Sequence, residues 1–310
     1  MKNKAAFLGG GVSLAVLLAL IVTTLDTQFF PILIWVLPLP LMYVFSKFGW
    51  RSGTAVFFCG CAALLILNQT AIIIVVAFFM LLGAAMGAMI YLKKSALAVL
   101  MLGSFAGTAI FIAGLAIALT VFHYDPVNAI TAQLLSTFDA TVRQASSALS
   151  NDQLRMLSIY RDVISDLVYY TPSLLVSSAT GIALIVELIS LPVLRLLRVS
   201  APHWRPFRRW HVTKSVVWIY LFVLLVLYFN LYGDKGSAFF NIAVNFQYML
   251  GLLLIIQGFS FFYEIAHQRR WPLIVPIFLT FAGLLLLDWI KILGIIDLGF
   301  DMRKRFNRKV

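Results

Sequence analysis

The sequence predicts an all-α protein, a polytopic bundle of about eight or nine transmembrane helices without a substantial soluble domain. Hydrophobic residues make up 62% of its 310 residues, and charged residues only 12%. Soluble domains carry about 25% charged residues. The apolar residues also fall in continuous runs, many of them close to the roughly 20 residues that cross a bilayer as a helix. Continuous runs differ from the alternating pattern of a membrane barrel, so helices are the form that satisfies the backbone in lipid.

Nine candidate spans follow one another along the chain. They are residues 5–24, 29–46, 53–67, 71–92, 96–122, 170–197, 215–232, 238–266 and 271–295. Lys2 and Lys4 precede the first span and no small-residue cleavage site follows it, which predicts an uncleaved first helix. Pro38-Leu39-Pro40 interrupts the second span, and prolines at both ends bracket the sixth. Such breaks free backbone carbonyls that can line a cavity.

The lysines and arginines predict the orientation of the chain. With the N-terminus in the cytoplasm, the first eight spans leave only Arg143, Arg155, Arg161 and Lys235 in outside loops. We therefore expect a multi-pass protein of a bacterial cytoplasmic membrane. This topology also accounts for the net charge of +12, so no nucleic-acid partner is expected. The region 271–295 has two alternatives, a ninth full span or a re-entrant pair turning near 288–291.

Three regions are expected along the chain. Residues 1–197 form a six-helix membrane bundle with an outer helical hairpin at 123–169. Residues 198–214 form a basic cytoplasmic loop, and residues 215–310 form the C-terminal membrane helices and a basic tail. Within the hairpin, Asp125-Pro126 predicts one helix start and Ser150-Asn151-Asp152 predicts a second.

Small residues recur four positions apart on three spans, a spacing that lets two helix backbones approach closely. Two interpretations stay open: packing within the protein, or docking of another membrane protein by the first helix. These residues are Gly11, Ala15 and Ala19 on the first span, Gly83 and Gly87 on the fourth, and Gly103 and Gly107 on the fifth.

Polar side chains inside two spans are candidates for substrate binding. Glu187 lies near the middle of the span 170–197, where a carboxylate costs several kcal/mol unless it is paired, wetted or protonated. Asn241, Asn245 and Tyr248 form one polar stripe near the outer end of the span 238–266. Both groups point to a solute, proton or ion site, or to hydrogen bonds between neighbouring helices.

The inner loop combines basic residues with tryptophan, a pattern that suits an anionic lipid surface. The residues concerned are Arg205, Arg208, Arg209 and Trp210. A second interpretation of this loop is docking of a cytoplasmic partner or a phosphorylated ligand.

No motif in the chain predicts catalysis. Cys59 and Cys61 stand in an apolar run without a nearby histidine, and the four histidines are scattered. Neither pattern has metal-ligand spacing. We expect a protein that is not an enzyme, with no metal site and no cofactor.

Three segments resemble the DUF2232 or YybS-like group of uncharacterised bacterial membrane proteins: Pro38-Leu39-Pro40, Arg205-Pro206-Phe207-Arg208-Arg209-Trp210, and residues 293–305. This group is distantly similar, over residues 1–197, to the substrate-binding components of energy-coupling-factor importers. The resemblance implies a solute site between helices near the outer face. It also implies a first helix that docks a membrane partner, which the ladder of Gly11, Ala15 and Ala19 matches. The spans 215–295 and the outer hairpin depart from that six-helix pattern.

Two functions follow from these observations. The first is small-solute binding or transport, with Glu187 and the polar faces of the later spans lining the site. The alternative is a non-transporting scaffold or signalling partner that binds another membrane protein through its small-residue faces.

Overall fold

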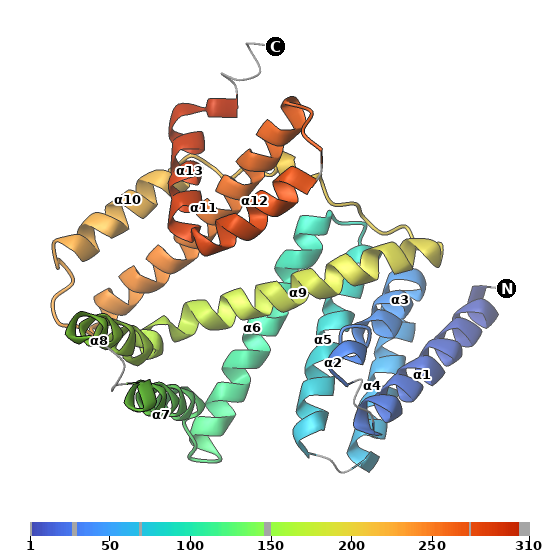
Figure 1. The fold of residues 1–310 in the computed structure, drawn as a ribbon. Coiled ribbons are helices and arrows are strands. Elements are labelled where there is room, and N and C mark those ends of the chain that lie inside the picture. Colours follow the sequence, from blue (N-terminus) through green and yellow to red (C-terminus); the bar gives the residue numbers. More distant parts are fainter. Residues whose placement is uncertain (1, 27–29, 68–69, 146–149, 273, 304–310) are drawn as a thin grey trace. The chain divides into compact units, whose positions relative to one another are not determined.

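The computed structural model describes residues 2–26, 30–67, 70–145, 150–272 and 274–303 (Figure 1). Every regular element in these ranges is helical, which confirms the all-α prediction. The chain divides into two compact units. The first unit comprises Met1–Tyr124 and Leu175–Trp204, and the second comprises Asp125–Leu174 and Arg205–Val310. The expected hairpin 123–169 thus groups with the C-terminal helices, whereas the sequence placed it with residues 1–197.

The first unit contains the N-terminal helices and most of α9. Its elements are α1 (Lys2–Asp26), α2 (Phe30–Leu33), α3 (Pro38–Phe48), α4 (Trp50–Leu67), α5 (Thr70–Tyr91), α6 (Ala96–Thr120) and α9 (Thr171–Leu196). The expected interruption by Pro38-Leu39-Pro40 is present, because α2 ends at Leu33 and α3 begins at Pro38. Proline is well suited to the first turn of a helix, where its missing N–H would have no helical acceptor.

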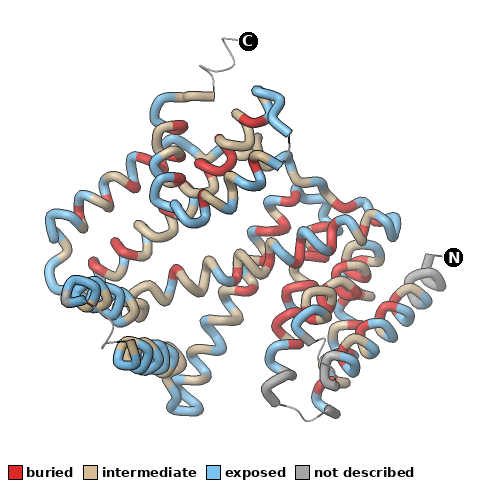
Figure 2. Tube along the Cα trace, in the orientation of Figure 1, coloured by how far each residue is buried: buried red, intermediate tan, exposed pale blue. Residues whose placement is uncertain are grey.

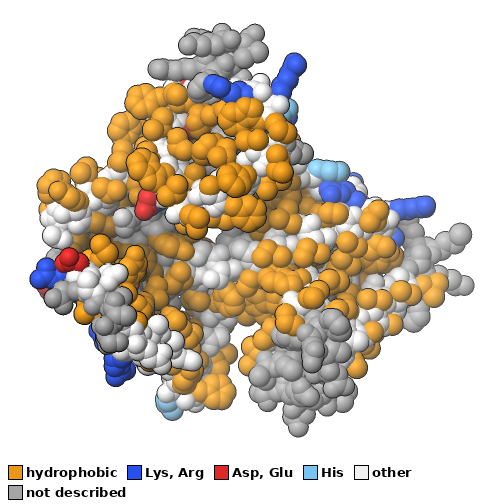
Figure 3. Space-filling view, in the orientation of Figure 1, with side chains coloured by type: hydrophobic (Ala, Val, Ile, Leu, Met, Phe, Trp, Pro, Cys, Tyr) orange, Lys and Arg blue, Asp and Glu red, His pale blue; other side chains and the backbone are white. Residues whose placement is uncertain are grey.

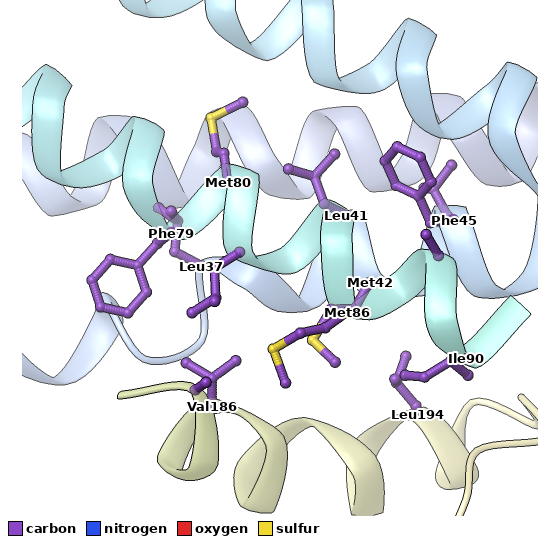
Figure 4. Close-up of a cluster of buried hydrophobic side chains, with 14 of the residues drawn as sticks. Leu37, Leu41, Met42, Phe45, Phe79, Met80, Met86, Ile90, Val186 and Leu194 are labelled. Atoms are coloured by element: carbon purple, nitrogen blue, oxygen red, sulfur yellow. The ribbon is translucent and has the colours of Figure 1, made fainter. Parts of the chain in front are cut away.

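The core of the first unit lies where α3, α5 and α9 meet. Figure 4 shows Val186 and Leu194 of α9 directed toward Met42, Met86 and Ile90 of the other two helices. All five side chains are at most 2% exposed. Burial at this density indicates that the helices of the first unit are held together by close apolar packing.

The second unit contains the helical hairpin and the C-terminal helices. Its elements are α7 (Pro126–Ala145), α8 (Asn151–Asp166), η2 (Leu167–Tyr170), η3 (Phe207–Arg209), α10 (Ser215–Tyr228), α11 (Ala238–Gln268), α12 (Ile274–Leu285) and α13 (Leu287–Phe300). Buried positions are frequent on α11 and rare on α7 and α8 (Figure 2).

Both predicted helix starts in the hairpin are confirmed. The Asp125 carboxylate accepts hydrogen bonds from two backbone N–H groups of the first turn of α7, each at 3.1 Å. Ser150 and Gln153 form a reciprocal capping box at the start of α8. Arg161 of α8 pairs with Asp139 of α7 at 3.0 Å, and this ion pair joins the two arms.

A backbone contact between α11 and α13 holds the second unit together. A Cβ atom added to Gly294 would lie 2.1 Å from the carbonyl oxygen of Leu254, and one added to Gly258 would lie 2.1 Å from that of Ile290. No side chain fits into either space. The helices therefore touch backbone to backbone, a contact that the small-residue predictions did not include.

The described residues do not confirm the eight or nine full-length spans expected. Five described stretches are long and apolar enough to cross a membrane: Pro31–Phe48, Ile74–Tyr91, Ala96–Thr120, Asp152–Leu196 and Ala238–Gln268. The pair α12 and α13 raises the number to six if it counts as one span. The expected first, third and seventh spans correspond to shorter apolar helices, Leu8–Thr23, Trp50–Leu65 and Ser215–Tyr228. The last of these, α10, has 14 residues and is about 21 Å long, less than the ~30 Å hydrocarbon core.

The region 271–295 is not one straight helix. α12 and α13 are bent by 113° at a short break that contains Leu286. The bend lies just ahead of the expected turn at 288–291, and it is the geometry of a broken span or a re-entrant pair. A single uninterrupted ninth span is therefore wrong.

Hydrophobic side chains cover much of the drawn surface of α12 and α13 (Figure 3). Leu285 is 86% exposed, Ile274 is 72% exposed and Phe278 is 70% exposed. Water-soluble monomers rarely display contiguous apolar surface of this kind. Lipid is the environment in which these side chains are stable.

Candidate functional site

Glu187 lies on the buried face of α9. Ala179, Ala183, Val186 and Leu194 are buried at helical spacing along that face. The Glu187 side chain is fully buried as well, and neither carboxylate oxygen has a hydrogen-bond partner in the described part of the chain. Buried polar groups in folded proteins are almost always paired, so each unpaired one calls for an explanation.

Ser190 extends this polar patch by one turn. It is fully buried, and its hydroxyl also has no hydrogen-bond partner among the described residues. Residues three apart are neighbours on a helix surface, so Glu187 and Ser190 share one face. Pro192 lies inside α9 and has no N–H, so the carbonyl of Leu188 loses its usual helical donor. One stretch of α9 thus supplies a carboxylate, a hydroxyl and a backbone carbonyl.

Oxygen atoms without internal donors suit a bound cation, a proton or a hydrogen-bond donor of a solute. Apart from Asp26, whose side chain is outside the described residues, Glu187 is the only acidic residue in the sequence of the first unit. The described residues contain no cluster of three His, Cys, Asp or Glu side chains that could hold a metal ion. A site at Glu187 would therefore rely on one carboxylate and neutral oxygens.

The predicted stripe of Asn241, Asn245 and Tyr248 belongs to the second unit and joins α11 to the segment around η2. Asn245 donates to the carbonyl of Tyr169 at 2.8 Å and accepts from the backbone N–H of Ser173 at 2.8 Å. Its amide also donates to the carbonyl of Asn241 at 2.7 Å.

Tyr248 of this stripe packs edge to face on Tyr170, with ring centroids 6.1 Å apart. Asn241 donates to the carbonyl of Gly236 at 3.2 Å. These contacts hold local structure in the second unit, although the Oδ1 atom of Asn241 is buried without a hydrogen-bond partner among the described residues. Glu187 lies in the first unit.

The small residues of α5 and α6 are packed inside the first unit. A Cβ added to Gly83 would lie 2.6 Å from the carbonyl oxygen of Pro38, and one added to Gly87 would lie 2.8 Å from Cα of Met42. Gly103 and Gly107 face Ala183 and Ala179 of α9 in the same way, with 3.2 Å to the alanine Cβ atom in each case. These four glycines serve internal helix packing.

The small residues of α1 have a different environment. Gly11, Ala15 and Ala19 are all exposed. A Cβ added to Gly11 would meet nothing within 4 Å. Among the predicted small-residue faces, this one is free to meet lipid or another protein.

The basic loop is fixed to α11 and α13 through Arg303. Its guanidinium donates to the buried carboxylate of Asp297 at 2.8 Å and to the hydroxyl of Ser260 at 3.1 Å. It also donates to the backbone carbonyls of Arg208 at 2.8 Å and Trp210 at 3.1 Å.

Further hydrogen bonds from α11 hold the same loop. Ser260 donates to the backbone carbonyl of Phe207 at 2.8 Å, and Gln257 accepts from the backbone N–H of Val212 at 2.9 Å. Trp210 donates from Nε1 to the carbonyl of Arg205 at 3.0 Å. The part of the loop that begins at Arg205 is therefore an ordered part of the second unit, whereas residues up to Trp204 belong to the first.

Three residues of these sites were not among the predicted ones: Ser190, Asp297 and Arg303. The signal for Asp297 was the same as for Glu187, a carboxylate in an apolar run. The signal for Ser190 was its position three residues after Glu187, which places both side chains on one helix face. Arg303 had no comparable signal, because its partners lie up to 95 residues away.

Membrane-length apolar helices and exposed apolar side chains define a polytopic α-helical membrane protein. The chain belongs to the family described as "Predicted membrane protein (DUF2232)", whose model matches residues 13–298. This confirms the family resemblance seen in the sequence. The chain is also similar to "Uncharacterized protein YybS" of Bacillus subtilis (strain 168), with 24% identity over 320 residues, covering 98% of this chain and 99% of the relative. No solved structure matches, and the similarity to importer substrate-binding components stays a prediction.

Proposed function

We propose that this protein is a solute-binding component of a bacterial cytoplasmic membrane, with a role in transport and its N-terminus in the cytoplasm. The solute is a small cation, inorganic or organic, and Glu187 and Ser190 hold it. One observation carries the proposal: a fully buried carboxylate and a fully buried hydroxyl on one face of α9 have no partner among the described residues.

The free-energy cost of such groups supports this assignment. A buried acceptor left without a donor costs about 1–3 kcal/mol, and a charged one costs more. An apolar residue at either position would avoid that cost. Ionisable side chains inside membrane segments mark substrate or ion pathways more often than structural positions. The proposed role is binding, and no catalytic step is assigned.

The test uses the full-length protein in an uncharged detergent. Thermal unfolding is followed while sodium, potassium, magnesium, manganese and choline chlorides are titrated at constant ionic strength. At least one cation is expected to raise the melting temperature of the wild type but not of Glu187→Gln. Ser190→Ala is expected to weaken the shift, whereas Ser178→Ala, at an exposed position of the same helix, leaves it unchanged.

Asp288→Asn is the control for loss of one negative charge, because the Asp288 side chain is 89% exposed. The proposal is wrong if no cation shifts the wild type, or if Glu187→Gln responds like the wild type.

A second candidate function is a non-transporting scaffold that binds another membrane protein through α1. The exposed face of Gly11, Ala15 and Ala19 favours it, because the other predicted glycine faces are filled by neighbouring helices. Native mass spectrometry of protein extracted from its own membrane separates the two candidates. A retained partner chain that is lost in Ala15→Leu, but kept in Val16→Leu on the same exposed helix, supports the scaffold.

A further inference from the structure

The second unit contains an open cleft of about 660 Å³ that is lined mainly by arginine and histidine side chains. Three separate segments converge on it: the basic loop, the C-terminal end of α11 and the residues after α13. The basic and imidazole side chains that line it are Arg208, Arg209, His211, His267, Arg270 and Arg303. Basic residues far apart in the sequence thus meet at one concave surface.

Most of the charge of this cleft is not neutralised by the described residues, among which only Arg303 of the lining arginines pairs with a carboxylate, that of Asp297. Glu264 is its only acidic lining residue, and it accepts a hydrogen bond from Gln268 at 3.0 Å. The guanidinium groups of Arg208, Arg209 and Arg270 make no hydrogen bond or ion pair in the part of the chain that the structure describes. With the histidines neutral, four arginines and one glutamate leave a formal charge of +3 on the lining.

Arg303 plays a different part from the other arginines. Its side chain is 14% exposed, and its donors are used by Asp297, Ser260 and two loop carbonyls. It therefore fixes the backbone that carries Arg208. The ring of Phe207 packs on Trp210 at 5.2 Å and on Tyr263 of α11 at 5.5 Å, which holds η3 in place. A fixed backbone lowers the ordering cost when Arg208 and Arg209 bind a ligand.

We infer that this cleft binds a multiply charged, phosphate-bearing anion. Planar guanidinium groups match phosphate oxygens in a bidentate manner, and three of them here have no partner among the described residues. The volume falls in the range of about 300–1,000 Å³ of small-molecule sites. A flat basic surface would serve contact with a bilayer as well, but these residues line a concavity instead. The phosphate belongs either to a lipid headgroup or to a soluble compound.

The experiment uses the delipidated full-length protein with two probes. One is inorganic pyrophosphate, measured by isothermal titration calorimetry. The other is nanodiscs of phosphatidylcholine with or without about 20% phosphatidylglycerol, in which retained lipid is identified by native mass spectrometry. The variant Arg208→Gln with Arg270→Gln is expected to weaken binding by about tenfold or more. Higher salt is expected to weaken wild-type binding.

The matched control is Lys94→Gln with Arg155→Gln, which removes the same charge at exposed positions outside the cleft. Pyrophosphate binding that only the cleft variant loses identifies a soluble phosphate compound. Selective retention of phosphatidylglycerol that only the cleft variant loses identifies a lipid headgroup. The inference is overturned if the wild type binds neither probe, or if both double variants lose binding equally. Unchanged melting temperatures establish that the variants are folded.

Discussion

The two units differ in how their buried acidic side chains are paired. In the first unit a large apolar core surrounds Glu187 and Ser190, which have no described partners. In the second unit the apolar core is smaller, and Asp297 is buried but bonded to Arg303 and Gln257. A buried polar group with partners is explained by the structure that it holds together. The Glu187 carboxylate has no such explanation among the described residues, and this observation carries the proposed solute site in the first unit.

In their use of glycine the two units are alike. Gly83 and Gly87 let α5 approach the backbone of α3 in the first unit, and Gly258 and Gly294 bring α11 and α13 together in the second. Gly11 on α1 makes no such approach. Close backbone contact thus holds both units, and only α1 keeps an unused small-residue face.

The largest expected effect is the loss of α11–α13 packing in Gly294→Leu. The added side chain cannot fit where even a Cβ atom would lie 2.1 Å from a backbone oxygen. We expect destabilisation by more than about 4 kcal/mol, the range that only severe packing faults reach. Limited proteolysis of the detergent-solubilised protein measures the effect, with new cleavage confined to the second unit.

Gly299→Leu is the matched control in the same helix, because nothing lies within 4 Å of a Cβ at Gly299. Equal protease sensitivity of the two variants would show that the backbone contact does not hold the unit together.

The next largest change in stability is expected when each of the two buried carboxylates is replaced by leucine. Asp297→Leu removes the partner of Arg303 and leaves a mostly buried charge, so we expect a loss of about 3–5 kcal/mol. Glu187→Leu removes a group with no described partner, so we expect a gain of about 1–3 kcal/mol. Thermal unfolding in detergent measures both changes.

Asp288→Leu, at an exposed position, is expected to change stability little and serves as the control. A loss of stability in Glu187→Leu as large as that in Asp297→Leu would mean that Glu187 has a structural partner. The two buried carboxylates would then not differ in their pairing.

The smallest effect is expected at the exposed ion pair between Lys235 and Asp166, which lie 2.7 Å apart. Lys235→Met is expected to cost up to about 1 kcal/mol at neutral pH, because the Lys235 side chain is 54% exposed. The hydrogen bond with Asp166 raises the pKa of Lys235 above its ordinary value. Its contribution is therefore complete below the ordinary lysine pKa and disappears as the pH rises through the raised value.

Unfolding of the wild type and of Lys235→Met over an alkaline pH series measures this difference. A cost that persists at high pH and high salt would indicate packing of the lysine stem and not the ion pair.

The sequence alone determined the features that depend on near neighbours in the chain. The apolar runs predicted helices and a membrane environment, because a long helix that is apolar on all faces is stable in lipid and not in water. Asp125 and Ser150 predicted helix starts, because a cap acts over three residues. The flanking residues of Glu187 predicted its burial, and Pro38-Leu39-Pro40 predicted the break before α3. Each of these features is local.

Only the tertiary structure decided which of these groups have partners. Arg303 reaches carbonyls 93 and 95 residues away, and Gly294 meets the carbonyl of a residue on another helix. Neither partner can be read from spacing along the chain. The bend of 113° between α12 and α13 and the 14-residue length of α10 likewise appear only in the structure. Hydrophobicity determines whether a helix enters lipid. The contacts between helices determine where the helix ends and which of its polar groups have partners.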